Sequence, residues 1–381
     1  MAYVVDRAQL AAVLQRDGLT RSQLADVLER AGCSAWAAAA RGGGPEGGPA
    51  LPGASRQVLR ELCAGFVQHV PFEQLDVALG RGRRIDVAGV LAKVCGHGRG
   101  GTCLEINLLL LEALRALGFA ARPVLARVLL RGVMSGLTHM IVLVSLEGQE
   151  LLCDVGFGLG SLRGPIAIES REPCLLFPDA VRLRADEGAL DAPGALRLQR
   201  WEPSRWEAAG RADPRSPPGE ACWADQYVFH PARPMQPRDA LVANWWTSEF
   251  PGPDNWFTNS RLAVRATPKG WLALRALTMV HKERVGVADL RLLFGAATDE
   301  MLGHLPADAP AHAPAARGAP ADAHAVETSF ERLIEEEQHG ATLEREFGIR
   351  LGWNFKTGVV ETVTPESYRP GALHNAGFAR Q

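Results

Sequence analysis

The sequence predicts an α+β protein in which a helical part comes first and an antiparallel sheet follows. Two observations support this prediction. Apolar residues recur every three or four positions in the first part of the chain. From Ala121 onward, short runs rich in leucine and β-branched residues alternate with turns. At 381 residues the chain is long enough for two or three domains.

The helical part contains several segments with this spacing, separated by residues that break helices. Thr20 or Ser22 is a suitable N-cap for the second segment, and the glycine- and proline-rich run 42–49 predicts a loop. The predicted helical segments are Gln9–Val13, Leu24–Leu28, Ser55–His69 (stopped by Pro71), Asp86–Cys95 and Leu104–Leu117 (ending at Gly118). The last of these is apolar nearly all round, so we expect it to be buried.

Strand character dominates the middle of the chain, and a barrel or a sandwich would accommodate it. The predicted strands are Arg122–Leu130, Met140–Ser145, Glu150–Val155, Tyr227–Phe229, Ser260–Thr267 and Trp271–Val280, the last two joined by a hairpin turn at Thr267–Gly270. The stretch Asp186–Pro218 is polar with little regular pattern. Leu305–Ala325 is an Ala/Pro/His/Asp segment that we expect to be a flexible surface insertion. A charged helix is predicted from Phe330 to Phe347.

Composition argues against several classes of function. The formal net charge of −2 gives no basic field for nucleic acid, and no uninterrupted apolar stretch is long enough to cross a membrane. Seven scattered cysteines argue against a disulfide framework and for a reducing, cytoplasmic compartment; the charged start of the chain is unlike a secretory signal. Cys95 and His97 form the only close Cys/His pair, and without a second pair at suitable spacing no metal site is expected.

Three residues on predicted regular elements have the chemistry of an activated nucleophile. Cys103 follows Gly100 and Gly101 and comes just before the buried helix, where unpaired amides favour a thiolate. His139 lies just before an apolar strand and Asp154 just after another. Each residue alone has an ordinary structural explanation, as a small buried thiol, a surface imidazole or a turn carboxylate. Together they match the thiol, imidazole and carboxylate of a nucleophilic enzyme.

The blocks that contain these residues resemble those of a known family. Arg99–Asn107 (RGGTCLEIN), Thr138–Met140 (THM) and Asp154–Gly158 (DVGFG) are similar to the three signature blocks of the arylamine N-acetyltransferases. The resemblance also includes Pro71–Asp76, Ala243–Ser248, Phe257 and the Thr267–Gly270 turn. It covers roughly residues 28–280, with weaker similarity near 343–351.

The resemblance implies a three-part architecture: a helical domain over 1–122 with the nucleophile, a β-barrel domain over 123–235 with His139 and Asp154, and an α/β lid over 236–381 that contains the 305–325 insertion. It implies that Cys103 accepts an acyl group, that His139 is the base and that Asp154 orients it. Phe72, Phe257 and Thr102 would then contact the acceptor substrate, and Gly158, Leu159 and Gly160 would lie at the mouth for the cofactor. The implied cosubstrate is acetyl-CoA, with no metal, and the implied acceptor is a small-molecule arylamine, hydrazine or N-hydroxyarylamine.

Two departures from the family pattern keep rival readings open. Thr102 replaces the aromatic residue that usually precedes the nucleophile, and Leu159 stands where a second glycine is usual. A natural-product amide synthase with a carrier-protein thioester as donor would share the chemistry and differ in substrates. A transglutaminase- or protease-like hydrolase and a non-catalytic binding protein rank lower, the first because of the RGG block and the second because all three positions are filled.

Overall fold

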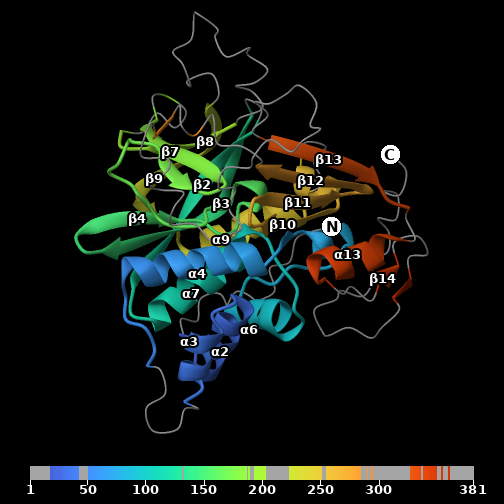
Figure 1. The fold of residues 1–381 in the computed structure, drawn as a ribbon, viewed down its shortest axis with the longest axis horizontal. Coiled ribbons are helices and arrows are strands. Elements are labelled where there is room, and N and C mark those ends of the chain that lie inside the picture. The colour runs from blue at the N-terminus through green and yellow to red at the C-terminus, as the bar shows by residue number, and fades with distance from the viewer. Residues whose placement is uncertain are drawn as a thin grey trace, which may run out of the picture.

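The computed structural model supports the predicted order of a helical part followed by antiparallel sheets (Figure 1). It describes residues 18–42, 50–130, 133–186, 188, 193–202, 223–250, 255–284, 290, 293–294, 327–335, 338–349, 353–354 and 359–360. The predicted segments 9–13 and 305–325 and nearly all of the glycine-rich run therefore lie outside the described residues. Among the described residues, no helix combines the length and the apolar character needed to cross a membrane.

The first part of the described chain is helical, and the cap predicted at Thr20 is confirmed. The helices are α2 (Arg21–Arg30), α3 (Ser34–Ala40), α4 (Arg56–His69), α5 (Leu75–Ala78), α6 (Val87–Leu91) with the π-helical turn η1 (Ala92–Gly96), and α7 (Cys103–Ala116). The Thr20 hydroxyl accepts a hydrogen bond from Gln23 N (3.2 Å), so Thr20 is the cap of α2. Ser55 caps α4 and Asp86 caps α6 in the same way.

An eight-stranded antiparallel sheet follows and curves into a barrel-like shape, as predicted. Its strand order is β5-β4-β3-β2-β9-β8-β7-β6. The strands are β2 (Ala120–Leu130), β3 (Val133–Leu146), β4 (Gln149–Cys153), β5 (Ile166–Ala167), β6 (Cys174–Leu176), β7 (Asp179–Ala185), β8 (Leu196–Trp201) and β9 (Trp223–Pro234).

Strand β8 lies in the stretch for which no regular structure was predicted. Its buried residues Leu196, Leu198 and Trp201 share the strand with polar residues that have partners on β9. Arg197 Nη1 lies 2.6 Å from an Asp225 oxygen, and Gln199 Nε2 donates to the other (2.8 Å). The polar side chains that suggested a loop therefore have their partners on the neighbouring strand β9.

A second antiparallel sheet joins the end of the chain to its beginning. Its order is β1 (Phe72–Glu73), β10 (Leu262–Thr267), β11 (Gly270–Arg275), β12 (Thr278–Arg284) and β13 (Glu327–Leu333). Because β1 pairs with β10, residues that immediately follow α4 become the edge of a sheet made by the last third of the chain. Helices α9 (Pro237–Ser248), α10 (Trp256–Asn259) and α13 (His339–Phe347) and the short pair β14 (Trp353–Asn354) and β15 (Val359–Val360) complete the described part.

Two predictions about this sheet were wrong. The single strand predicted over 271–280 is two strands, β11 and β12, joined at Ala276, which has φ +48°. This turn was missed because it contains no Gly, Asn or Pro. The helix predicted from Phe330 begins only at His339, because residues 327–333 pair with β12 along its whole length. Strand pairing therefore overrides the local helical pattern there.

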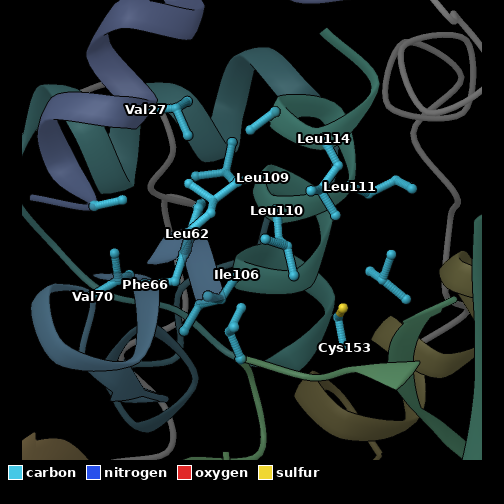
Figure 2. Packing of buried hydrophobic residues seen from close by; sticks show 14 of the residues in the cluster. Val27, Leu62, Phe66, Val70, Ile106, Leu109, Leu110, Leu111, Leu114 and Cys153 are labelled. Atoms are coloured by element: carbon cyan, nitrogen blue, oxygen red, sulfur yellow. The ribbon is translucent and has the colours of Figure 1, made fainter. Parts of the chain in front are cut away.

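The largest core lies between the helices and one face of β2, β3 and β4. Figure 2 shows Leu109, Leu110 and Leu114 of α7 near Leu62 and Phe66 of α4, with Cys153 of β4 at the edge of the cluster. All six side chains are buried. Because α7 contacts β2 and β3 as well as other helices, its position relative to the barrel-like sheet is held by apolar packing. The N-terminus of α7 carries the candidate nucleophile.

Candidate active site

Cys103 is the first residue of α7, with Thr102 as the N-cap. It is only 4% exposed, and its Sγ lies 3.7 Å from the Thr138 carbonyl oxygen. The preceding glycines allow close backbone contacts: a Cβ on Gly100 would lie 1.8 Å from the Pro71 carbonyl oxygen. The RGG segment therefore packs against the chain just before β1, which the bridge between Phe72 and Gly101 reinforces.

His139 and Asp154 come from neighbouring strands of the barrel-like sheet and meet as a buried pair. His139 lies within β3, and Asp154 directly follows β4. The distance from His139 Nε2 to Asp154 Oδ2 is 2.7 Å, and both side chains are at most 3% exposed. Since Nε2 faces the carboxylate, the other ring nitrogen, Nδ1, is left to form the hydrogen bond between His139 and the Cys103 thiol. The structure thus brings the three predicted residues together.

The loop after β4 reaches α7 through a glycine. A Cβ on Gly156 would lie 2.8 Å from Cys103 Cα and 2.9 Å from Asn107 Nδ2, closer than real Cβ contacts. Only glycine therefore fits this approach without a shift of backbone. The DVG sequence consequently matters for geometry as well as for the carboxylate.

Charge coupling favours a thiolate–imidazolium pair at this site. Burial opposes the charged ring, but the Asp154 carboxylate and Cys103 raise the pKa of His139 to about 10. Burial likewise opposes the thiolate, yet the charge of His139, its hydrogen bond and the Met140 amide hold the pKa of the Cys103 thiol below its usual value. The arrangement can thus supply an ionised sulfur nucleophile next to a proton donor.

Asn107 is a site residue that the sequence reasoning did not single out. It lies one helical turn after Cys103 and is fully buried. Its Nδ2 donates to Asp154 Oδ1 (2.8 Å) and to the Met140 carbonyl (2.7 Å), and its Oδ1 accepts from the Val155 amide (2.9 Å). The spacing of four from Cys103 was a usable signal, because residues i and i+4 share one face of a helix.

Aromatic rings pack around the imidazole. The ring centroid of Phe157 lies 4.7 Å from that of His139, and the centroid of Tyr227 lies 5.1 Å from it. Tyr227 is fully buried on β9; burial and the Asp154 carboxylate together raise the pKa of its hydroxyl well above the usual value. These rings exclude water from the His139–Asp154 pair, which strengthens its charge interaction.

The residues predicted to contact substrate and cofactor lie in three places. Phe72 is buried on β1 next to the turn η2 (Gly158–Gly160): a Cβ on Gly158 would lie 3.4 Å from its ring. Leu159 in this turn is half-buried, and its carbonyl accepts from Arg200 (2.8 Å). Phe257 is half-buried on α10. The Thr102 hydroxyl is turned onto Glu105 (3.1 Å). Thus Phe72 and the turn are adjacent, while their roles stay predictions.

No cluster of three metal-binding side chains occurs within the described part of the chain. Cys95 and His97 lie at the end of η1. Burial raises the pKa of the Cys95 thiol to about 12, which disfavours the thiolate form that binds metals.

Comparisons with known proteins agree on one family. Residues 56–304 match the model of a family described as N-acetyltransferase. The chain is 30% identical over 247 residues to the arylamine N-acetyltransferase / N-hydroxyarylamine O-acetyltransferase of Salmonella typhimurium, which covers 62% of this chain and 79% of the relative.

Solved structures give the same result for the fold. The arylamine N-acetyltransferase of Salmonella typhimurium superposes with a TM-score of 0.54 at 26% identity, covering 68% of this chain and 81% of that one. That of Mycobacterium marinum, solved in complex with CoA, gives a TM-score of 0.58 at 20% identity, covering 84% and 91%.

Proposed function

Since the chain belongs to the arylamine N-acetyltransferase family, we propose that it transfers an acetyl group from acetyl-CoA to an arylamine, a hydrazine or an N-hydroxyarylamine through a thioester on Cys103. The single observation that carries this proposal is the buried contact among Cys103, His139 and Asp154 at the start of α7. The three-part division at 122/123 and 235/236 is proposed with it.

Acetyl transfer to the enzyme uses the ion pair directly. The Cys103 thiolate attacks the carbonyl carbon of the thioester, and the electron pair of the carbonyl moves onto oxygen. Amides at the start of α7 stabilise this oxyanion. When the carbonyl re-forms, the bond to the coenzyme sulfur breaks, and the leaving thiolate takes the proton that His139 carries. Cys103 is then an acetyl thioester, and His139 is neutral.

The second half of the reaction reverses these roles. The acceptor nitrogen attacks the Cys103 thioester, neutral His139 takes its proton, and the amide forms as the Cys103 thiolate leaves. The imidazolium again lies between a thiolate and the Asp154 carboxylate, so the site returns to its starting charge state. Asp154 keeps its hydrogen bond to Nε2 of the ring throughout, which leaves Nδ1 for the proton transfers.

The donor is the point on which the rival amide-synthase hypothesis differs. The relatives that match are described as arylamine N-acetyltransferases, and a solved neighbour holds CoA, which favours a CoA thioester over a carrier-protein thioester for this chain. For the same site we propose that Phe72, Phe257 and Thr102 lie on the acceptor side and that the turn Gly158–Gly160, which is adjacent to Phe72, borders the donor.

Covalent loading tests the proposal. Mass spectrometry after mixing with acetyl-CoA is expected to find one added acetyl group, mapped to Cys103, and none in Cys103→Ala. The matched control is Cys33→Ala, which removes a half-buried thiol whose pKa burial and Glu61 raise to about 11; it is expected to load like the parent. Acetyl label on another cysteine, or no label with acetyl-CoA, would refute the proposal.

A further inference from the structure

Asn107 connects the three elements that supply the candidate triad. It stands on α7 four residues after Cys103, it bonds to the carbonyl of the residue that follows His139 on β3, and it bonds to Asp154 and Val155 in the loop after β4. Both hydrogens of its amide nitrogen and its amide oxygen are used. One neutral side chain thereby fixes the positions of α7, β3 and the loop after β4 relative to one another.

The bond to Asp154 determines how that carboxylate is presented. Asn107 Nδ2 (2.8 Å) and the Gly156 amide (3.1 Å) both donate to Oδ1, which leaves Oδ2 for His139 Nε2 (2.7 Å). Two donors on one oxygen stop the carboxylate from rotating. The bond to the Met140 carbonyl also holds the backbone of Met140, whose amide forms a hydrogen bond to the Cys103 sulfur.

We infer that Asn107 is a positioning residue of the acetyl-transfer site, which fixes the Asp154 carboxylate and sets its distance from the Cys103 helix; this inference rests on the proposed function. The alternative is that Asn107 merely fills the core between α7 and the sheet. A core role predicts that its variants lose activity only in proportion to lost stability. A positioning role predicts that the acetylation rate depends on the charge of the side chain at position 107, which unrelated core variants would not show.

The nearly isosteric variant Asn107→Asp separates these alternatives. Its carboxyl group can replace the amide donor only while it is protonated; once ionised, it puts a second negative charge about 3 Å from Asp154 Oδ1. The Tyr227 hydroxyl and the Cys153 thiol also face Asp154, but both have pKa values well above the usual range and stay neutral. The shared proton between the two carboxyl groups is therefore the only new titration near neutral pH.

The experiment measures the rate constant for acetylation of Cys103 across roughly pH 5 to 8, where a carboxyl pair of this kind loses its shared proton. For Asn107→Asp we expect the variant-to-parent ratio to fall as pH rises. For Asn107→Leu, which removes the donor altogether, we expect a ratio lowered about 10- to 100-fold at every pH, as for loss of a hydrogen bond to a charged group.

The matched control is Leu111→Ala, a buried apolar change on the same helix about two turns beyond Cys103. It is expected to lower the melting temperature and leave the ratio near one. A ratio for Asn107→Asp that does not change with pH, or losses no greater than those of Leu111→Ala, would overturn the inference even if Asn107→Leu fails to fold. Failure of the parent itself to load Cys103 would instead overturn the proposed function.

Discussion

Gly156 offers a perturbation whose size can be read from the structure. It is the residue at which the loop after β4 passes closest to the first turn of α7, and a Cβ there would lie 2.8 Å from Cys103 Cα. Carbon atoms in ordinary contact are about 3.5 to 4.0 Å apart. Because both partners belong to backbone, Gly156→Ala should separate the loop and the helix by about 0.7 Å or more.

This separation acts on the groups that react. Asp154 lies two residues before Gly156, and Cys103 lies on the other side of the contact, so the shift moves the His139–Asp154 pair away from the sulfur. A misplacement of about 1 Å costs on the order of 100-fold in rate. Overpacking a tight site also costs about 1–3 kcal/mol of stability. We therefore expect Cys103 acetylation by acetyl-CoA to slow about 100-fold, with an earlier midpoint in urea denaturation.

Gly340→Ala is the control for this variant. Gly340 is exposed within α13, and a Cβ there meets nothing within 4 Å. Gly340 is the second residue of α13, so alanine should gain at most the roughly 0.5–1 kcal/mol by which it is favoured over glycine in a helix interior. This variant should therefore be no less stable than the parent and load at the parental rate. Parental loading and unchanged stability in Gly156→Ala would show that the close contact does not exist.

Two further predictions concern charge. Because the pKa of His139 is raised to about 10, its ring is charged at neutral pH and holds the pKa of the Cys103 thiol below its usual value. Asp154→Asn should move the iodoacetamide-labelling profile of Cys103 to higher pH, and equal profiles would contradict the coupling. Arg99→Met should cost about 3–5 kcal/mol in urea denaturation, because it removes the guanidinium that pairs with the buried Glu73 and the half-buried Asp76. Lys93 and Arg99 lower the pKa of Asp76, although burial opposes this. The stability that they give is therefore present at neutral pH and is lost on acidification. The difference in unfolding free energy between variant and parent should shrink at acidic pH. Arg41→Met, which breaks an exposed pair with Glu29, should change stability little.

Local sequence signals predicted the helical part well. Thr20, Ser55 and Asp86 each precede an apolar spacing of three and four, and each caps the helix that follows. Such signals are sufficient because a capping side chain and its helix are neighbours in the sequence. The leucine-rich segment after Cys103 was also predicted correctly as buried helix, since it is apolar around most of its circumference.

The sheets depend on partners that local patterns do not reveal. Strand β8 alternates Leu196 and Leu198 with polar residues whose partner, Asp225, is more than 20 residues away. The charged sequence of β13 suits a helix, and it forms a strand because β12 pairs with it. The pairing of β1 with β10 joins residues nearly 200 positions apart. In each case the information lies in the pairing rather than in the strand.

The candidate site also contains residues that local sequence signals predicted and one that they did not. Cys103, His139 and Asp154 could be proposed from sequence because each stands at the start, within or at the end of a regular element, where its side chain has a predictable direction. Asn107 could not be assigned so easily, since an asparagine within a buried helix acquires a role only from what lies opposite. Its three partners come from two other elements, brought there by the close approach of Gly156. A helical spacing of four between a nucleophile and a buried amide therefore suggests that the face opposite holds the rest of the site.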